Sequence, residues 1–221
     1  MSFRANAGKT CAGFAVAPAY PRRREGVTAL FITTKRLFLR PLWPEDAPLL
    51  ARRMGEPEVL RNLGTPPSPF TLDAAKQKIA ADAACWPSTV QLGAFLRTED
   101  GPELAGGVGF GARADRGGET ALSYWIAKEW QGRGISVEAG SALLEHAFLA
   151  HRLPTLTARH YADNPASGRV LEKLGFTALP GTQKVFCRPR GEDVDSICFS
   201  LTRADWERHS GLLAEPLRRA A

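Results

Sequence analysis

The sequence predicts a single α/β (α+β) domain built around one largely antiparallel sheet, with helices on both faces of that sheet. Three observations predict this fold class. The chain has 221 residues, the length of one ordinary domain. Its hydrophobic fraction of 44% and charged fraction of 24% are those of a globular protein. Its apolar pattern also changes repeatedly between a two-residue period and a helical period.

The first part of the chain is expected to form a strand and two helices. Alternation of Leu37 and Leu39 with other residues predicts a strand over 32–41. A proline followed by two acidic residues predicts the start of a helix over 44–54. After a proline-rich loop, the threonine that begins residues 71–84 is placed to cap a second helix.

Three strands separated by glycine-containing turns are expected next, over residues 90–97, 103–111 and 119–127. The second of these strands contains GGVGFG, which has the glycine spacing of a dinucleotide-binding fingerprint. Because those glycines do not open a helix, we interpret them as a structural feature of the strand.

The last third of the chain alternates helices and strands. Apolar residues at helical spacing predict a helix over 135–151, and a strand over 155–160 follows a proline. The helix expected over 165–174 begins with proline and ends at glycine, which is typical of helix termini. Two strand patterns, over 184–188 and 196–201, complete the domain, and we see no internal repeat.

The composition argues against several classes of protein. The 29 basic and 23 acidic residues give a net charge of +6, but the basic residues do not form the aromatic-interleaved stripe of a nucleic-acid-binding surface. No apolar run approaches the ~20 residues needed to span a bilayer. The cysteines lack the spacing of a zinc site, so we expect reduced thiols, no metal and a cytoplasmic protein. The four cysteines are Cys11, Cys85, Cys187 and Cys198.

Both ends of the chain are expected to lie outside the folded domain. The first thirty residues have little periodicity, and Pro18 interrupts the short apolar stretch that would form a signal peptide. The sequence AGKT at residues 7–10 does not complete a P-loop, because Phe3 stands where that motif requires glycine. We expect a flexible tail over 1–30, the folded domain over 31–208 and a C-terminal tail over 209–221.

The stretch WQGRGIS carries the strongest functional signal in the chain. It places Gly132 and Gly134 between an expected strand and the helix over 135–151. A tight turn or a helix entry would explain glycine at these positions. A bound phosphate would also explain it, because backbone N–H groups and the positive end of the helix dipole converge there, and Arg133 adds a charge.

The loop from Gln131 to Ser136, QGRGIS, resembles the Q/R-x-x-G-x-G/A pyrophosphate loop of the GCN5-related N-acetyltransferase (GNAT) superfamily. The flanking sequences are similar to those of its RimJ/RimL-type branch of ribosomal-protein N-acetyltransferases. Together they extend the resemblance over about residues 32–206. The stretches that carry it are TKRLFLRPLWPEDA (34–47), SYWIAKEWQGRGISVEA (123–139) and NPASGRVLEKLGF (164–176).

The resemblance implies how the fold would bind acetyl-CoA as a co-substrate. It implies a single GNAT-type domain whose central sheet is splayed between two parallel strands, over 123–127 and 155–160. The pantetheine chain of acetyl-CoA would pair with the strand backbone near Ile126 and Lys128. The pyrophosphate would bind the following loop, whose expected cofactor-binding residues are Gln131, Gly132, Arg133, Gly134, Ile135 and Ser136.

The same resemblance assigns the chemistry of acetyl transfer to a few groups. The backbone N–H near Ile126 would stabilise the oxyanion of the tetrahedral intermediate. Asn164 and Ser167 match the N-x-x-S element of the family. Asn164 would hydrogen-bond the cofactor chain, and the Ser167 hydroxyl would lie near the sulfur. Helix capping is the alternative role for both residues.

The general base is the feature in which this chain departs from the family pattern. Relatives often have glutamate at the position of Ala121, and Leu171 stands where other branches place a catalytic tyrosine. Glu119 lies two residues before Ala121 on the same strand face and is the candidate base, with a solvated surface charge as the alternative. Tyr124 and Trp125 are expected to pack within the strand, with the alternative that one of them lines the acceptor cleft.

These observations favour an N-acetyltransferase that moves an acetyl group from acetyl-CoA to a primary amine by direct attack in a ternary complex. The acceptor would be a protein N-terminus or a small-molecule amine, and the fold alone does not decide between them. The alternative is a catalytically weak or inactive acyl-CoA-binding regulatory module, because the usual acid is missing. Nucleic acid and membrane partners are not expected, and a homodimer is left open.

Overall fold

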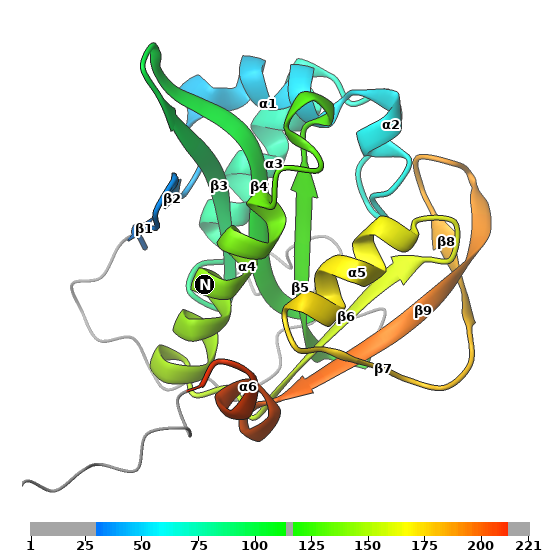
Figure 1. Ribbon diagram of the computed structural model, residues 1–221. Coiled ribbons are helices and arrows are strands. Elements are labelled where there is room, and N and C mark those ends of the chain that lie inside the picture. Colours follow the sequence, from blue (N-terminus) through cyan, green and yellow to red (C-terminus); the bar gives the residue numbers. More distant parts are fainter. Residues whose placement is uncertain (1–29, 114–116, 212–221) are drawn as a thin grey trace, which may run out of the picture.

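The computed structural model describes residues 30–113 and 117–211, and in these residues nine strands form one sheet (Figure 1). The strands lie in the order β1-β2-β3-β4-β5-β6-β9-β7, and β8 also pairs with β9. Among the strands of the described residues, only β5 and β6 pair in parallel. The strands are β1 (Ile32–Thr33), β2 (Leu37–Arg40), β3 (Thr89–Thr98), β4 (Gly101–Arg113), β5 (Glu119–Ile126), β6 (Thr155–Tyr161), β7 (Thr177–Ala178), β8 (Gln183–Cys187) and β9 (Glu192–Thr202).

Helices cover both faces of the sheet, with α4 and α5 on one face and α1 and α3 on the other (Figure 1). The α-helices are α1 (Ala47–Met54), α2 (Pro57–Leu60), α3 (Leu72–Ala84), α4 (Ile135–Glu145), α5 (Pro165–Lys173) and α6 (Arg203–His209). The shorter helical segments are the 3₁₀ turns η1 (Pro44–Asp46) and η3 (Lys128–Trp130) and the π-helical η4 (His146–Ala150), which extends α4.

Each face of the sheet has its own hydrophobic core. On one face, Leu122 of β5 and Leu171 of α5 belong to a large cluster that includes α4. On the other face, Leu50 of α1 and Ile79 of α3 pack in a second cluster. Because both faces are covered, the central strand β4 is buried continuously over residues 104–112 and not only at alternate positions.

The sheet opens between the parallel strands β5 and β6. These strands share one register pair, Ala121 with Thr157. In contrast, β5 pairs with β4 along its whole length, and β6 pairs with β9 along its whole length. Each strand is therefore held by its other neighbour, and the two separate towards their C-terminal ends. This arrangement confirms the predicted fold class, a largely antiparallel sheet splayed between two parallel strands.

The strand predicted over 32–41 is a hairpin in the structure. β1 and β2 pair antiparallel, and the Arg97 side chain donates to the Thr34 carbonyl oxygen in the turn between them at 2.8 Å. The short elements α2, α6 and β7 have no counterpart in the sequence-based prediction. Segments of two to seven residues are too short to show a distinct hydrophobic period, which explains these omissions.

The expected tails lie almost entirely outside the described residues, which begin at residue 30 and end at residue 211. Within those residues, helix α6 ends at His209, one position beyond the predicted limit of the domain. None of the helices that the structure describes is long and apolar enough to cross a membrane.

The cysteines only partly follow the prediction of reduced thiols. Cys187 and Cys198 are free, but Cys85 is disulfide-bonded, so the prediction is wrong for that residue. Sequence spacing did not reveal the bond because pairing depends on the distance between two cysteines in the fold. Over the described part of the chain, the structure shows no cluster of three or more His, Cys, Asp or Glu residues that would hold a metal ion.

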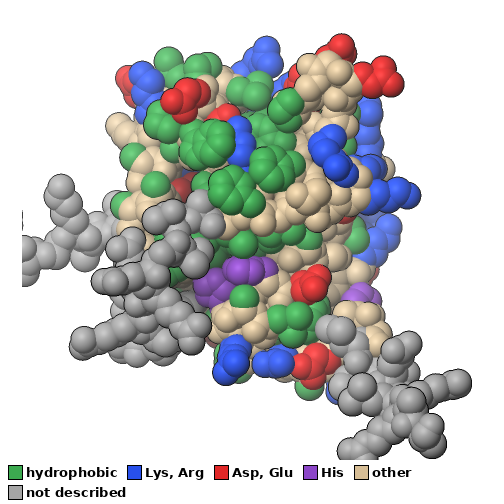
Figure 2. Space-filling model, turned by 90° about the vertical axis from the view of Figure 1, so that its left-hand side faces the viewer, with side chains coloured by type: hydrophobic (Ala, Val, Ile, Leu, Met, Phe, Trp, Pro, Cys, Tyr) green, Lys and Arg blue, Asp and Glu red, His purple; other side chains and the backbone are tan. Residues whose placement is uncertain are grey.

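Aromatic side chains gather on the outer surface of the β1–β2 hairpin. Figure 2 looks onto this side of the molecule and shows a group of hydrophobic side chains around a basic one. Phe31 and Trp43 are half exposed, and Phe31 stacks on Phe38 with ring centroids 5.9 Å apart. The Arg40 guanidinium lies 4.0 Å from the ring centroids of both Trp43 and Phe95.

Candidate active site

β5 and β6 have separated at the C-terminal end of β5. At this end β5 pairs with β4 on one side, and its other side faces the opening. The N–H of Ala127 donates to Ala105 in β4 at 2.9 Å. Neighbouring residues of a strand direct their N–H groups to opposite sides. The N–H of Ile126 therefore faces the opening, where the resemblance places a donor for an oxyanion.

The loop after β5 leads into a helix that starts without a side-chain cap. Gly134 is the N-cap of α4 with φ of 74°, and Gly132 has φ of 73°. Both values favour glycine, so the backbone conformation is one reason for these two residues. Because Gly134 has no side chain, the first N–H groups of α4, including those of Ile135 and Ser136, stay available to a ligand or water. The Ile135 side chain is buried in the core, so only its backbone N–H can contribute.

The space beside these glycines is open. A Cβ atom added to Gly132 would meet no described atom within 4 Å, and one added to Gly134 would approach only Arg36, at 3.7 Å. Gln131 and Arg133 are exposed at the rim of the same loop. The loop has room for an anion, and the helix dipole together with the arginine side chains favours a negative charge there.

The β1–β2 turn fixes the start of α4. The Glu138 carboxylate accepts hydrogen bonds from Thr34 Oγ1 at 2.5 Å, from the Arg36 backbone N–H at 2.8 Å and from Arg36 Nε at 2.7 Å. Arg36 Nη1 also donates to the Arg133 carbonyl oxygen at 3.0 Å. Burial opposes ionisation of Glu138, but the hydrogen bonds from Thr34 and Arg36 outweigh it and lower the pKa of this carboxyl. The sequence does not reveal this contact, because its partners are about a hundred positions apart.

The two positions expected to pair with pantetheine, Ile126 at the end of β5 and Lys128 at the start of η3, have partners within the chain. The Gln131 side chain donates to the Ile126 carbonyl oxygen at 3.0 Å. The Lys128 N–H donates to the Glu56 carboxylate at 3.1 Å. The Lys128 side chain forms an ion pair with Glu58, which raises the pKa of Lys128 and lowers the pKa of Glu58. A pantetheine chain that paired at Ile126 and Lys128 would therefore replace the contacts made by Gln131 and Glu56.

The first turn of α5 faces the same opening from the side of β6. Asn164 caps this helix, because its side-chain oxygen accepts a hydrogen bond from the Ser167 N–H at 3.3 Å, and Pro165 follows the cap. The Ser167 hydroxyl lies 2.8 Å from the Tyr124 hydroxyl, which also donates to the Ser167 carbonyl oxygen at 2.9 Å. Tyr124 was expected to pack within its strand, and the structure shows that it also bonds across the opening.

Comparison with known proteins identifies the architecture. Residues 36–177 match the family model of the acetyltransferase (GNAT) domain. The chain belongs to the GNAT acetyltransferase family. It is 27% identical over 172 residues to the uncharacterized N-acetyltransferase YoaA of Bacillus subtilis, a match that covers 78% of this chain and 96% of that protein. It is 31% identical over 85 residues to a ribosomal protein uS5 alanine N-acetyltransferase of Escherichia coli, covering 38% of this chain and 43% of that protein.

Solved structures show the same fold. The RimL ribosomal L7/L12 alpha-N-protein acetyltransferase in complex with coenzyme A has a TM-score of 0.67 and 19% identity, covering 78% of this chain and 98% of that one. A GNAT-family acetyltransferase from Bacillus anthracis has a TM-score of 0.66 and 19% identity, covering 79% of this chain and 99% of that one. At these identities the likeness concerns the fold.

Within this GNAT fold, Glu119 lies away from the opening. It is the first residue of β5, is exposed, and pairs with Arg113 of β4. It precedes the Ala121–Thr157 pair that joins β5 to β6. Ile126 lies seven residues further along the strand, about 23 Å away at 3.3 Å per residue. The structure therefore places Glu119 at the other end of β5 from the group that contains Ile126 and Ser167, and its role as the base stays a prediction.

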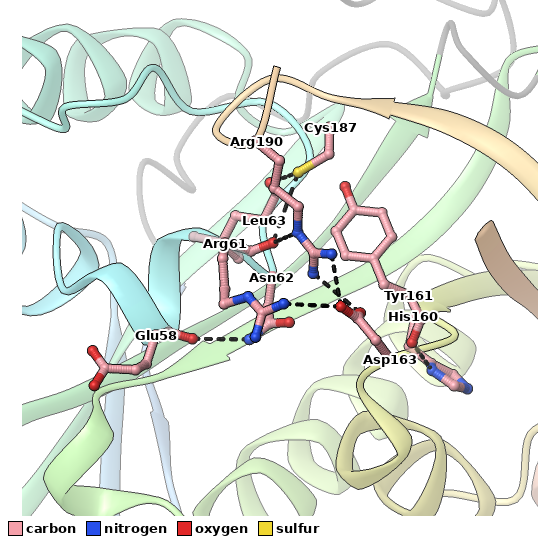
Figure 3. Close-up of polar contacts among 9 residues, drawn as sticks. All are labelled: Glu58, Arg61, Asn62, Leu63, His160, Tyr161, Asp163, Cys187 and Arg190. Carbon is pink, nitrogen blue, oxygen red and sulfur yellow. Dashed lines mark hydrogen bonds and ion pairs between the residues drawn. The ribbon is translucent and has the colours of Figure 1, made fainter. Parts of the chain in front are cut away.

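A polar cluster that the sequence analysis missed joins three loops of the GNAT domain (Figure 3). The Asp163 carboxylate accepts hydrogen bonds from Arg190 at 2.8 and 3.1 Å and from Arg61 at 2.9 Å. Arg190 Nε donates to the Arg61 carbonyl oxygen at 2.7 Å, and the buried Cys187 thiol donates to the Leu63 carbonyl oxygen at 3.5 Å. The hydrogen bonds from Arg190 lower the pKa of Asp163. The cluster ties the loop after α2 to the C-terminal ends of β6 and β8.

A cavity of about 510 Å³ lies between α1, the β3–β4 turn and the loop after β5, and Arg133 of that loop is among its lining residues. Arg53 lines this cavity together with Glu103 and Glu129, and it forms ion pairs with both. Neither Ser167 nor Tyr124 lines it. The cavity therefore does not include the two residues that meet at the opening between β5 and β6.

Proposed function

We propose that the chain transfers the acetyl group of acetyl-CoA to a primary amine by direct attack of the amine in a ternary complex. The observation that carries the proposal is the start of α4. It combines a glycine N-cap, open space and the exposed side chains of Gln131 and Arg133 beside two separated parallel strands. Backbone N–H groups at such a helix start suit a pyrophosphate.

The residues around the opening fit an extended acyl-CoA. In our proposal the pyrophosphate lies on the backbone N–H groups of residues 132–136, and Arg133 adds charge at the rim. The backbone of Ile126 at the end of β5 and of Lys128 at the start of η3 would hold the pantetheine chain, and the side-chain amide of Asn164 would donate to it from the start of α5. Bound acetyl-CoA would supply the activated acyl group. The protein would position this group and provide the hydrogen bonds around it.

The groups at the opening also fit the chemistry of amide formation. The Ile126 N–H, which faces the opening, would stabilise the oxyanion that forms when the amine attacks. The Ser167 hydroxyl would donate a hydrogen bond to the leaving sulfur. The amine must be neutral to attack. Because position 121 is alanine and Glu119 lies at the other end of β5, we propose that water accepts the proton of the amine.

We propose a protein N-terminus as the first acceptor to test and a small-molecule amine as the second. The support for a protein acceptor is the similarity to the Escherichia coli enzyme named for alanine acetylation of ribosomal protein uS5. That similarity covers 38% of this chain, so the acceptor must be established directly.

The first experiment is calorimetric titration of the whole chain with acetyl-CoA. Thiol release is then measured with peptides that carry an N-terminal alanine or serine and with a panel of small amines. Binding with release would support the proposal, and the panel would identify the class of acceptor. Binding without release for every acceptor would favour an acyl-CoA-binding module. The absence of acetyl-CoA binding would contradict the proposal.

A further inference from the structure

The side chain of Tyr124 spans the opening between β5 and α5. Three residues before it, Ala121 makes the single pair that joins β5 to β6. At Tyr124 itself the neighbour across the opening is the first turn of α5, through the 2.8 Å contact with Ser167 Oγ and the 2.9 Å contact with the Ser167 carbonyl oxygen. A tyrosine hydroxyl therefore lies directly against the serine that the family motif assigns to the sulfur.

The number of protons limits how these two hydroxyl groups can bond. Burial raises the pKa of Tyr124 to about 12, in spite of its hydrogen bond with Ser167, so the phenol stays protonated at neutral pH. The Ser167 carbonyl oxygen can only accept, whereas each hydroxyl can both donate and accept. Tyr124 either donates to the carbonyl oxygen and accepts from Ser167, or donates to Ser167 Oγ. In the second arrangement the proton of Ser167 is free to point into the opening.

We propose that Tyr124 is a positioning residue that directs the Ser167 hydroxyl towards the sulfur of CoA. The proposal rests on the proposed function, in which the sulfur lies near Ser167. As negative charge develops on the sulfur, Tyr124 donates to Ser167 Oγ and Ser167 donates to the sulfur. The pair thus forms a short chain of hydrogen bonds that ends on the leaving group.

The reaction balances without a change in the charge of either residue. The nitrogen lone pair forms the C–N bond, and the electrons of the C–S bond leave with the sulfur. The nitrogen loses one proton and the sulfur gains one, with water carrying the proton between them. Tyr124 and Ser167 end the reaction protonated as they began, because their contribution is hydrogen bonding to the thiolate and not proton transfer to it.

The position of the Tyr124 hydroxyl beside Ser167 also bears on the absence of the tyrosine that other GNAT branches have at position 171. Leu171, which stands where other GNAT branches place a catalytic tyrosine, is fully buried. It lies one turn after Ser167, and residues four apart share a face of a helix. Tyr124 brings a phenol to this part of α5 from the neighbouring strand.

The test uses CoA itself, so it does not depend on the acceptor. The affinity of the whole chain for CoA and for desulfo-CoA is measured by calorimetry between pH 7 and pH 10, in the wild type and in Tyr124→Phe, which keeps the ring. We expect the wild type to bind the CoA thiolate about tenfold more tightly than the thiol, as for hydrogen bonds to a charged group. We expect Tyr124→Phe to lose most of this preference and to bind desulfo-CoA normally.

Three further variants separate a positioning role from a general loss of structure. Ser167→Ala should lose the same preference, and the double variant should lose no more than Ser167→Ala alone, because Tyr124 acts through Ser167. Tyr161→Phe is the matched control. It removes a buried phenol whose hydroxyl lies beside Cys187, and it should leave the preference unchanged.

The outcomes are distinct. Tyr124→Phe with the wild-type preference, or additive losses in the double variant, would overturn the inference and leave the proposed function standing. No binding of CoA or acetyl-CoA by the wild type would overturn the proposed function and the inference together.

Discussion

The starts of α4 and α5 lie at the same opening in the sheet but are built in opposite ways. α4 follows β5 and begins at Gly134, which has a positive φ and no side chain. α5 follows β6 and begins at Asn164, whose side chain caps the helix and is followed by Pro165. The first start leaves backbone N–H groups available, whereas the second uses its own side chain to satisfy one of them.

The two helix starts therefore suit different roles: the start of α4 suits the binding of an anion, and the start of α5 suits the positioning of side chains. An uncapped helix start can stabilise an anion only if something else fixes the helix, and Glu138 provides this through its bonds to Thr34 and Arg36. A capped start cannot offer the same N–H groups, but it holds the side chains of its first turn in place. Ser167 is such a side chain, and Tyr124 bonds to it from the opposite strand.

The largest expected effect is at the uncapped start. Gly134→Val should lower the affinity for acetyl-CoA by about 100-fold or more, because a β-branched residue at φ of 74° displaces the loop and its side chain occupies open space. Calorimetric titration measures the change. Gly181→Val is the matched control, since Gly181 has φ of 82° and equally open surroundings in the β7–β8 loop. Normal affinity in Gly134→Val would contradict the assignment of the phosphate site.

The next effect concerns the side chain that the capped start holds. Ser167→Ala should lower kcat by about tenfold or more and leave the affinity for acetyl-CoA unchanged, because the hydrogen bond forms to charge that develops on the leaving sulfur. Thiol release with an acceptor from the panel measures kcat. An unchanged kcat would remove Ser167 from the chemistry.

A smaller effect tests whether the cap of α5 has a second role. Asn164→Ala should lower the free energy of unfolding by about 1 kcal/mol through loss of the cap. It should also weaken acetyl-CoA binding several-fold through loss of a donor to the pantetheine chain. Thr202→Ala is the control, because Thr202 caps α6 by accepting from the Asp205 N–H at 3.1 Å. Equal affinities in the two variants would show that Asn164 is a cap alone.

The anchor of α4 predicts a modest effect that depends on pH. Glu138→Gln should lower the free energy of unfolding by roughly 0.5–1 kcal/mol at neutral pH, because it removes a partly buried pair with Arg36. The folded state lowers the pKa of Glu138 from its ordinary value of 4.5, so this stabilisation is complete above that pH and is lost as the pH falls below it. Denaturant unfolding at pH 7 and pH 4 should show the difference between wild type and variant shrinking. A constant difference would argue against the ionised pair.

The smallest expected effect is at the closed end of β5. Glu119→Gln should leave both kcat and the affinity for acetyl-CoA unchanged, because Glu119 is exposed and precedes the pair that joins β5 to β6. Kinetics with the same acceptor as for Ser167→Ala give the comparison. A large loss of kcat would support Glu119 as the base and show that the acceptor binds near the start of β5.

Much of this protein was determined by local sequence. Alternation of apolar residues predicted most of the strands, and proline and glycine marked the helix ends, because hydrophobic period and backbone freedom are properties of neighbouring residues. The two glycines before α4 belong to this class as well. Their positive φ values reflect a local backbone requirement that WQGRGIS shows directly.

The tertiary structure decided which residues meet. The ion pair of Arg36 with Glu138, the contact of Tyr124 with Ser167 and the cluster around Asp163 all join residues far apart in the chain. No periodic pattern encodes such pairs, because each depends on how strands, helices and loops that are distant in the sequence pack together. The register of β5 with β6 places Glu119, which shares a strand face with Ala121, at the closed end of β5.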